Sequence, residues 1–373
     1  MWYFRSPSIV YGEDALSFLS ELPYERILIV TDRNIAKAGL LSILHSNLPS
    51  GSKNLVIDNI PEEPTISDVT DRSKQVMEFA PDLIIGMGGG SSMDAAKALF
   101  VMYERPDLDL FDITPLVHLG LRKKSRLILV PTTSGTGSEC TWAAVLSDRD
   151  HGRKNELASP EIIADYAILD PVLVRNLPQS ITRNTAVDAI THAVEGHSSQ
   201  WKNPYSEAMA EKALRLITHN LPAVLRDGNM KSRELVHIGA SMAGLSFSNS
   251  QIGLAHALGH SLGAHFRIAH GMSVGLYLPY VVDFNQDYSV ESYEILRQCF
   301  PEKYRGENLG ETIRRFFREI GQPLDLKATG IARDEYDLHL SGMVGLAEES
   351  TGIITNPREA DSQQILELFE AVE

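Results

Sequence analysis

The feature that most constrains the fold is an alternation of short apolar runs and helix-like stretches in the first half of the chain. The apolar, β-rich runs are Arg26–Thr31, Asn54–Asp58, Asp82–Met87, Arg126–Val130 and Tyr166–Leu169. The helix-like stretches between them are Ile35–Leu48, Ile66–Phe79 and Met93–Tyr103. Nearly continuous apolar strands that alternate with helices are typical of a parallel sheet covered on both faces. We therefore expect an α/β domain with a parallel sheet.

The second half has a different pattern, in which apolar residues recur at helical spacing and few β-branched runs remain. Helices are expected at Ala186–Gly196, Ser206–Leu221, Arg233–Ser248, Leu254–His265, Leu309–Ile320, Asp334–Glu349 and Gln363–Val372. We place the domain boundary where the pattern changes. Residues 1–178 are predicted to form the α/β domain, and residues 179–373 an all-helical domain.

Composition and charge exclude several classes of protein. A net charge of −15 over 373 residues argues against an extended basic surface for nucleic acid or anionic lipid. No apolar stretch approaches about 18 residues, so no membrane span is expected, and the N-terminus lacks the pattern of a signal peptide. The two cysteines, Cys140 and Cys299, exclude a disulfide framework and a thiolate-rich metal site. We expect a cytoplasmic enzyme in which histidines and carboxylates hold any metal.

Two loops of the first half are typical of phosphate binding. The glycine-rich segment Gly86–Asp94 follows a predicted strand and opens a helix, whose first N–H groups and positive dipole end favour an anion. The segment Pro131–Glu139 also follows a strand and offers hydroxyls and two glycines. Both should lie at the carboxyl edge of one sheet, where ligands of open α/β sheets bind. The alternative is that each is a tight turn that binds nothing.

Asp32 follows the first of the five runs and could accept hydrogen bonds from an adenosine ribose, which favours NAD over NADP. Its alternative role is to cap the helix that begins near Ile35. In the usual dinucleotide-binding order the acidic residue follows the glycine-rich turn, whereas Asp32 precedes it. A dinucleotide would therefore be bound by a different order of elements.

Histidines and an aspartate in the second half indicate a metal site. Asp188 and His192 are four residues apart, so on a helix they project from one face. His256 and His260 repeat that spacing, and His270 follows. One aspartate with several histidines suits Zn²⁺ or Fe²⁺. Spacing alone leaves open which of the other histidines join Asp188 and His192: His197, His256, His260, His265 or His270.

Taken together, these segments resemble the iron-containing (group III) alcohol dehydrogenase family, which has the dehydroquinate-synthase-like fold. The stretches that carry the resemblance are Ile29–Asp32, Gly88–Lys97, Pro131–Glu139, Asp188–Glu195, Phe247–Gly259 and His270-Gly271. The resemblance implies an N-terminal dinucleotide-binding domain, a helical C-terminal domain and an active site in the cleft between them.

The resemblance also implies roles for individual residues. The metal ligands would be Asp188, His192, His256 and His270, and the ion Fe²⁺, with Zn²⁺ possible. His260 would lie near the substrate, outside the coordination sphere, as the catalytic histidine. The contacts to NAD would be Asp32, Gly89, Gly90, Ser91, Asp94, Thr132, Thr133, Thr136, Thr141 and Lys154.

The expected activity is that of a metal-dependent alcohol dehydrogenase, which transfers a hydride between a primary alcohol or diol, or its aldehyde, and NAD(H). The alternatives are a glycerol dehydrogenase-like polyol oxidoreductase with zinc and fewer histidine ligands, and a non-catalytic protein that binds metal or nucleotide. The expected partners are a small alcohol or aldehyde and further copies of the chain, because Tyr3–Tyr11 has strand character and could pair across a dimer edge.

Overall fold

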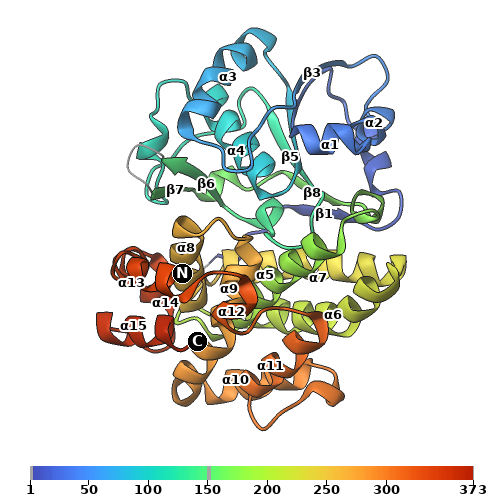
Figure 1. Cartoon of the computed structure of the whole chain (residues 1–373). Coiled ribbons are helices and arrows are strands. Elements are labelled where there is room, and N and C mark those ends of the chain that lie inside the picture. Colours follow the sequence, from blue (N-terminus) through green and yellow to red (C-terminus); the bar gives the residue numbers. More distant parts are fainter. Residues whose placement is uncertain (1–2, 149–152, 373) are drawn as a thin grey trace. The chain divides into compact units, whose positions relative to one another are not determined.

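The computed structural model describes residues 3–148 and 153–372. The described chain divides into two compact units (Figure 1). The first comprises the described residues up to Thr133 together with Gly137–Asn176. The second comprises Ser134–Thr136 together with the described residues from Leu177 onward. A short piece of the loop after the fifth strand therefore belongs with the second unit.

The first unit is built on a parallel sheet, in which six described strands have the order β1-β8-β5-β4-β2-β3. These strands are β1 (Ser8–Tyr11), β2 (Arg26–Val30), β3 (Lys53–Ile57), β4 (Leu83–Gly88), β5 (Arg126–Pro131) and β8 (Tyr166–Leu169). All five apolar runs of the sequence became strands of this sheet. The predicted α/β class with a parallel sheet is confirmed.

Alternate residues of the buried strands supply two separate cores, because successive side chains point to opposite faces of a sheet. Leu28 and Val30 face α3 and α4, whereas Ile27 and Ile29 face α1 and α2. The helices are α1 (Arg33–Lys37), α2 (Leu40–Ser46), α3 (Ile66–Phe79) and α4 (Gly90–Glu104). Both faces of the sheet are covered, which explains the continuous apolar runs.

Two details of the first unit differ from the prediction. The expected helix Ile35–Leu48 is divided into α1 and α2 at Gly39, whose φ of 77° interrupts the helix. An antiparallel hairpin of β6 (Ala143–Asp148) and β7 (Arg153–Ala158) was not predicted. The N-terminal segment has the expected strand character, because β1 pairs with β8 of the same chain and forms one edge of the sheet, and pairing across a dimer stays a prediction.

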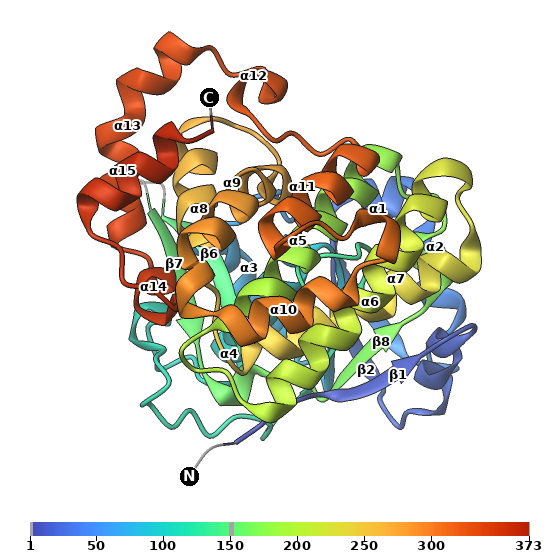
Figure 2. The same ribbon diagram turned by 90° about the horizontal axis from the view of Figure 1, so that it is seen from below.

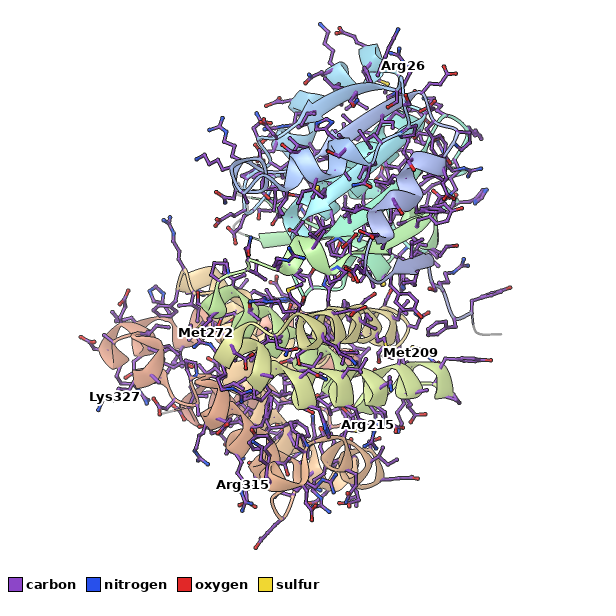
Figure 3. All side chains as sticks on the ribbon, turned by 90° about the vertical axis from the view of Figure 1, so that its right-hand side faces the viewer. Arg26, Met209, Arg215, Met272, Arg315 and Lys327 are labelled. Carbon is purple, nitrogen blue, oxygen red and sulfur yellow. The ribbon has the colours of Figure 1, made fainter. Side chains whose placement is uncertain are left out.

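The second unit is helical, and Figures 1 and 2 show its helices packed side by side. They are α5 (Gln179–Ser198), α6 (Pro204–Asp227), α7 (Met230–Ser248), α8 (Leu254–His265), α9 (His270–Asn285), α10 (Val290–Cys299), α11 (Leu309–Ile320), α12 (Leu326–Thr329), α13 (Arg333–Glu348), α14 (Thr351–Thr355) and α15 (Ser362–Glu370). Side chains fill the space between the ribbons of each unit (Figure 3). The all-helical class of this half is confirmed, although α9, α10, α12 and α14 were not predicted. In the described part of the chain, we find no helix with the length and apolar character that a bilayer span requires.

Candidate metal centre and nucleotide-binding loops

Three helices of the second unit bring a carboxylate and two imidazoles to one point. Asp188 lies on α5, His256 on α8, and His270 is the first residue of α9. One ligand atom from each lies within 4.8 Å of the others. Asp188 Oδ1 is 3.5 Å from His256 Nε2 and 3.2 Å from His270 Nε2.

Two atoms of this group are buried without a hydrogen-bond partner among the described residues: Asp188 Oδ1 and His256 Nε2. Burial of polar atoms without a partner is costly, so such pairs are rare in folded proteins. Here the two atoms face each other across a gap too long for a good hydrogen bond. One oxygen and two imidazole nitrogens are a donor set that suits Fe²⁺ or Zn²⁺. The residues therefore fit a divalent metal ion.

His192 lies next to this group but is not a member of it. Its Nε2 is 3.8 Å from Asp188 Oδ1. The ring of His192 is stacked between those of Phe247 and His256, at centroid distances of 4.0 and 4.5 Å. The stacking gives Phe247 a packing role at the site. The assignment of His192 as a ligand stays a prediction.

His260 lies one helical turn after His256 on α8. Its ring centroid is 5.0 Å from that of His270 and 5.7 Å from that of His256. The side chain of His270 is 37% exposed, whereas that of Asp188 is 3% exposed. Access to the group from solvent is therefore on the side of His270, and the catalytic role of His260 stays a prediction.

The other two histidines that spacing had left open have different neighbours. His197 Nε2 lies 3.7 Å from Glu211 Oε1. His265 Nδ1 lies 3.0 Å from the carbonyl oxygen of Ser261, and its ring is next to that of His339. Neither histidine belongs to the cluster of Asp188 within the described residues.

Burial and neighbouring charges determine the protonation of the cluster. Burial would raise the pKa of Asp188, but the imidazoles of His192 and His270 lower it well below its ordinary value. Burial lowers the pKa of His192 to about 3. Burial would also lower the pKa of His256, but the carboxylate of Glu195 raises it to about 9. Coordination through His256 Nε2 requires that this nitrogen carry no proton, so metal binding is coupled to the protonation of His256.

Glu195 is a residue of the site that the sequence analysis did not single out. Its Oε2 lies 2.5 Å from His256 Nδ1, and its Oε1 accepts a hydrogen bond of 2.6 Å from Ala255 N. Its spacing in the sequence could have identified it, because Glu195 follows Asp188 by seven residues and His192 by three on α5. Those three polar residues share one face of α5 and lie in its buried part, which runs from Ala186 to Ser198.

Two glycines allow the three helices to approach closely enough to form the cluster. A Cβ atom on Gly271 would lie 1.8 Å from the carbonyl oxygen of Asn184, on α5. A Cβ atom on Gly259 of α8 would lie 2.6 Å from Val274 Cγ1, on α9. Figure 2 shows α5, α8 and α9 as neighbours. The backbone contacts at these glycines set the distances between the ligand-bearing helices.

The glycine-rich turn of the first unit connects β4 directly to α4. Gly88 has φ 152°, and a Cβ atom there would lie 2.7 Å from Ser92 Cβ. Gly89 is the N-cap of α4 and has no side chain to cap the helix. The first N–H groups of α4, from Gly90 onward, have no acceptor within the helix and are oriented to bind an anion. The turn therefore has the geometry of a phosphate site.

The second loop adjoins this turn at the carboxyl edge of the sheet. Thr132 N donates a hydrogen bond of 2.9 Å to Gly88 O. A Cβ atom on Gly89 would lie 3.8 Å from Thr133 Cγ2. The structure thus brings Gly89, Gly90, Ser91, Thr132 and Thr133 together, and their contacts to a cofactor stay predictions.

Asp32 is the N-cap of α1, as the alternative interpretation expected. Its Oδ1 accepts hydrogen bonds from Asn34 N at 2.8 Å and Ile35 N at 3.2 Å. Its Oδ2 accepts one of 3.2 Å from Ser92 Oγ. The carboxylate therefore lies beside the glycine-rich turn, and a further role towards a ribose stays a prediction. Ser91 Oγ donates to the carbonyl oxygen of Glu62.

Asp94 and Thr141 are joined through the buried amine of Lys97. Lys97 Nζ donates hydrogen bonds to Ser138 Oγ at 2.9 Å, Thr141 Oγ1 at 2.8 Å and Ala143 O at 2.6 Å. Asp94 Oδ1 lies 3.4 Å from Lys97 Nζ and accepts a hydrogen bond of 2.6 Å from Ser138 Oγ. Burial lowers the pKa of Lys97. This network holds the loop after β5 against α4, and direct cofactor contacts of Asp94 and Thr141 stay predictions.

The remaining two predicted cofactor residues lie elsewhere. Thr136 belongs to the short loop segment that clusters with the helical unit. In that segment a Cβ atom on Gly135 would lie 2.6 Å from Thr185 Cβ, so glycine permits close contact with α5. Lys154 lies on β7, and its side chain is outside the described part of the structure. Both assignments stay predictions.

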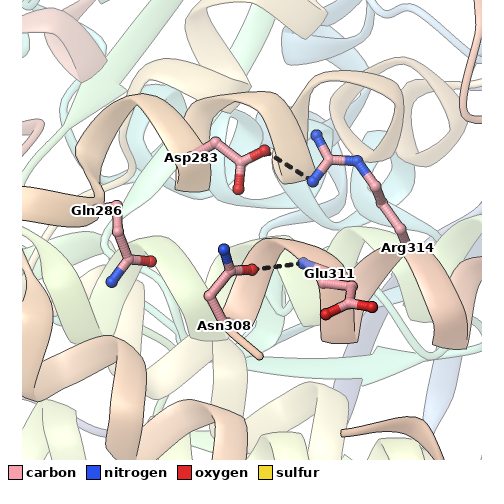
Figure 4. A pocket seen from close by; sticks show the side chains of 5 residues that line it. All are labelled: Asp283, Gln286, Asn308, Glu311 and Arg314. Atoms are coloured by element: carbon pink, nitrogen blue, oxygen red, sulfur yellow. Dashed lines mark hydrogen bonds and ion pairs between the residues drawn. The ribbon is translucent and has the colours of Figure 1, made fainter. Parts of the chain in front are cut away.

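A separate surface pocket lies at the end of α9 farthest from His270 (Figure 4). Asp283 Oδ2 and Arg314 Nη1 form an ion pair of 2.7 Å, and Asn308 caps α11. The lining residues are Asp283, Gln286, Asn308, Glu311 and Arg314. These contacts account for the pocket as part of the packing between α9 and α11.

Comparison with known proteins identifies the family. The family model for "Iron-containing alcohol dehydrogenase" matches residues 6–171, and the model for "Fe-containing alcohol dehydrogenase family, C-terminal" matches residues 182–372. The chain belongs to the iron-containing alcohol dehydrogenase family. This confirms the predicted family and fold class, and the iron of the family description agrees with the predicted ion.

Members of the family match along nearly the whole chain. An NADPH-dependent butanol dehydrogenase of Clostridium saccharobutylicum is 31% identical and covers 98% of this chain and 96% of its own length. The solved iron-containing alcohol dehydrogenase of Thermococcus thioreducens is 30% identical, has a TM-score of 0.90 and covers 100% of this chain and 99% of its own.

Some relatives are longer. An aldehyde-alcohol dehydrogenase of Streptococcus pneumoniae is 31% identical over 96% of this chain, but the match spans only 44% of that protein. The chain thus corresponds to less than half the length of this relative.

Proposed function

We propose that the protein is a metal-dependent alcohol dehydrogenase that transfers a hydride between a primary alcohol or diol, or the corresponding aldehyde, and NAD(H). The observation that carries the proposal is the pair of buried atoms without hydrogen-bond partners, Asp188 Oδ1 and His256 Nε2, next to His270 Nε2. Family membership supports the reaction class.

The proposed metal ligands are Asp188, His192, His256 and His270. A bound divalent ion would supply a Lewis acid that polarises an alcohol or carbonyl oxygen. The buried carboxylate of Asp188 compensates the positive charge in a site of low dielectric constant. The ring of His270 is partly exposed, so a substrate would reach the ion from the side of this residue.

We propose that the loops of the first unit bind the nicotinamide nucleotide. Gly89, Gly90 and Ser91 would bind the pyrophosphate through their N–H groups at the start of α4. Asp32 would accept hydrogen bonds from the ribose, which favours NAD. The remaining proposed contacts are Asp94, Thr132, Thr133, Thr136, Thr141 and Lys154. When bound, the nucleotide supplies the hydride acceptor, and the chain supplies orientation and charge.

We further propose that His260 holds the proton of the substrate hydroxyl at its imidazole. The position of its ring next to that of His270 supports this role. Residues 1–178 would act as the NAD-binding domain, and residues 179–373 as the metal-binding catalytic domain.

A polyol oxidoreductase that uses zinc is the second candidate. The compact group contains three ligand atoms, from Asp188, His256 and His270, and leaves out His192. A site with fewer histidines is the arrangement that we associate with glycerol dehydrogenase-like enzymes. The metal that supports turnover separates the two candidates.

The test loads the apo-protein with Fe²⁺, Zn²⁺, Co²⁺ or Ni²⁺ and measures reduction of NAD⁺ and NADP⁺ with a panel of primary alcohols, diols and glycerol. The proposal expects turnover of primary alcohols with NAD⁺, highest with iron. Turnover of glycerol with zinc alone would favour the second candidate. Binding of metal and NAD⁺ without turnover of any substrate would refute the enzymatic proposal in favour of a non-catalytic protein.

We also propose a cytoplasmic location and assembly into a homodimer or a larger homo-oligomer. Two buried cysteines without a disulfide, Cys140 and Cys299, are compatible with a reducing compartment. The edge strand β1 presents unpaired backbone groups, which can pair with another strand. A small alcohol or aldehyde is the proposed partner, with neither nucleic acid nor membrane.

A further inference from the structure

We propose that Glu195 is the positioning residue of the metal centre, because its carboxylate sets both the tautomer of His256 and the position of the helix that carries this histidine. The inference rests on the proposed metal site and assigns a role to a residue outside the ligand set. The two oxygens of Glu195 have different tasks, and each is visible in the contacts of the described residues.

The first task concerns the imidazole. Glu195 Oε2 lies 2.5 Å from His256 Nδ1, and both side chains are buried. An ionised carboxylate only accepts hydrogen bonds, so Nδ1 must be the donor. In the neutral imidazole the lone pair is then on Nε2, the atom that faces Asp188 Oδ1 at 3.5 Å. Glu195 thus selects the one neutral tautomer of His256 that can coordinate an ion at this point.

The second task concerns the start of α8. The N-cap of α8 is Gly253, which has no side chain to accept from the first N–H groups of the helix. Glu195 Oε1 accepts from Ala255 N at 2.6 Å and approaches His256 N at 3.4 Å. A Cβ atom on Gly253 would lie only 3.0 Å from this oxygen. A carboxylate of α5 therefore caps α8, and the glycine leaves room for it.

The two tasks together make the distance between α5 and α8 part of the metal site. Asp188 and Glu195 are both on α5, two turns apart, and they contact His256 from its Nε2 and Nδ1 sides. Residues of a single helix therefore flank both nitrogens of the ring, and the hydrogen bond at Nδ1 directs Nε2 towards Asp188. The carboxylate is 5% exposed, so water does not compete for these hydrogen bonds.

The test is Glu195→Gln, which separates the two tasks. The amide oxygen can still accept from Ala255 N, so the cap is retained. The amide nitrogen then donates to His256 Nδ1, which moves the imidazole hydrogen to Nε2. We expect the affinity for Co²⁺ and Zn²⁺, measured by chelator competition at one fixed pH, to fall by about 10- to 100-fold. The melting temperature of the apo-protein should stay close to that of the wild type.

The matched control is Glu104→Gln. Glu104 is also 5% exposed and also accepts from backbone N–H groups, those of Lys123, Lys124 and Ser125. It contacts no histidine among the described interactions and lies in the first unit, so its substitution should leave metal affinity unchanged. An equal loss of affinity in both variants would overturn the inference.

A double-mutant cycle covers the case in which Glu195→Gln lowers the stability of the apo-protein. In a His256→Ala background, Glu195→Gln should cause no further loss of metal affinity, because its effect passes through His256. The same loss in both backgrounds would overturn the inference, and so would an unchanged affinity in the single variant. Failure of the wild-type protein to bind any of these ions would instead refute the proposed function.

Discussion

The buried amine of Lys97 offers a sharp test of how the nucleotide-binding loops are held. Its side chain is fully buried, and its three N–H donors have acceptors at Ser138 and Thr141 in the loop after β5 and at Ala143, the first residue of β6. Lys97→Met keeps the length of the side chain and removes the charge and the donors. Removal of one partner from a buried ion pair costs about 3–5 kcal/mol. Because Asp94 is 14% exposed, we expect the lower end of this range, about 3 kcal/mol.

The assay is urea unfolding followed by circular dichroism, together with titration of NADH by its fluorescence. We expect weaker NADH binding, because the loop that Lys97 holds adjoins the glycine-rich turn. Metal affinity should be unchanged, because the proposed ligands all lie in the helical unit. The double variant Asp94→Asn/Lys97→Met should be more stable than the sum of the single changes, because it leaves no uncompensated carboxylate. A loss of less than about 1 kcal/mol in Lys97→Met, with NADH binding intact, would show that this buried amine does not hold the loop.

Three further predictions address other parts of the molecule. His256→Ala should lower metal affinity and NADH-linked turnover together, and retention of both at the wild-type level would contradict the ligand assignment. Asp32→Ser keeps a residue able to cap α1 but removes the charge, so the ratio of kcat/KM for NADP⁺ to that for NAD⁺ should rise; a wild-type preference for NADP⁺ would contradict the ribose contact. Burial lowers the pKa of His237 to about 4, so the unfolded chain binds more protons between pH 6.5 and 4. Stability should therefore fall by about 3 kcal/mol as the pH drops through this window, and urea unfolding of His237→Gln should show a smaller loss.

The local sequence predicted those parts of the fold whose burial is uniform along an element. The run from Ile27 to Val30 is buried on both faces of the sheet, so its continuous apolar sequence predicts a strand without information about the neighbouring strands. The hairpin β6–β7 is different, because β7 begins with polar residues and has Leu157 as its buried apolar residue. Its strand conformation depends on pairing with β6, which is a tertiary property.

Helix α9 illustrates a second limit. It is buried on most sides, so its apolar residues show no helical period, and Pro279 lies inside it. The apolar pattern after His270 therefore did not predict that this residue begins a helix. Spacing placed Asp188 and His192 on one face of α5, next to the cluster, whereas the approach of His256 and His270 to Asp188 depends on the packing of three helices. The contact of Glu195 with α8 could not be predicted, because it joins two helices through the cap of one of them.

The position of β1 at the edge of the sheet has a consequence for biosynthesis. This strand comes from the beginning of the chain, yet its partner in the sheet is β8, which begins at Tyr166. A parallel pair between distant segments forms slowly, because the entropy of closing a long loop is lost before the strands make stabilising contacts. On the ribosome, Ser8–Tyr11 must wait until nearly the whole first unit has emerged. During that time it is a short unpaired segment that other chains or chaperones can bind.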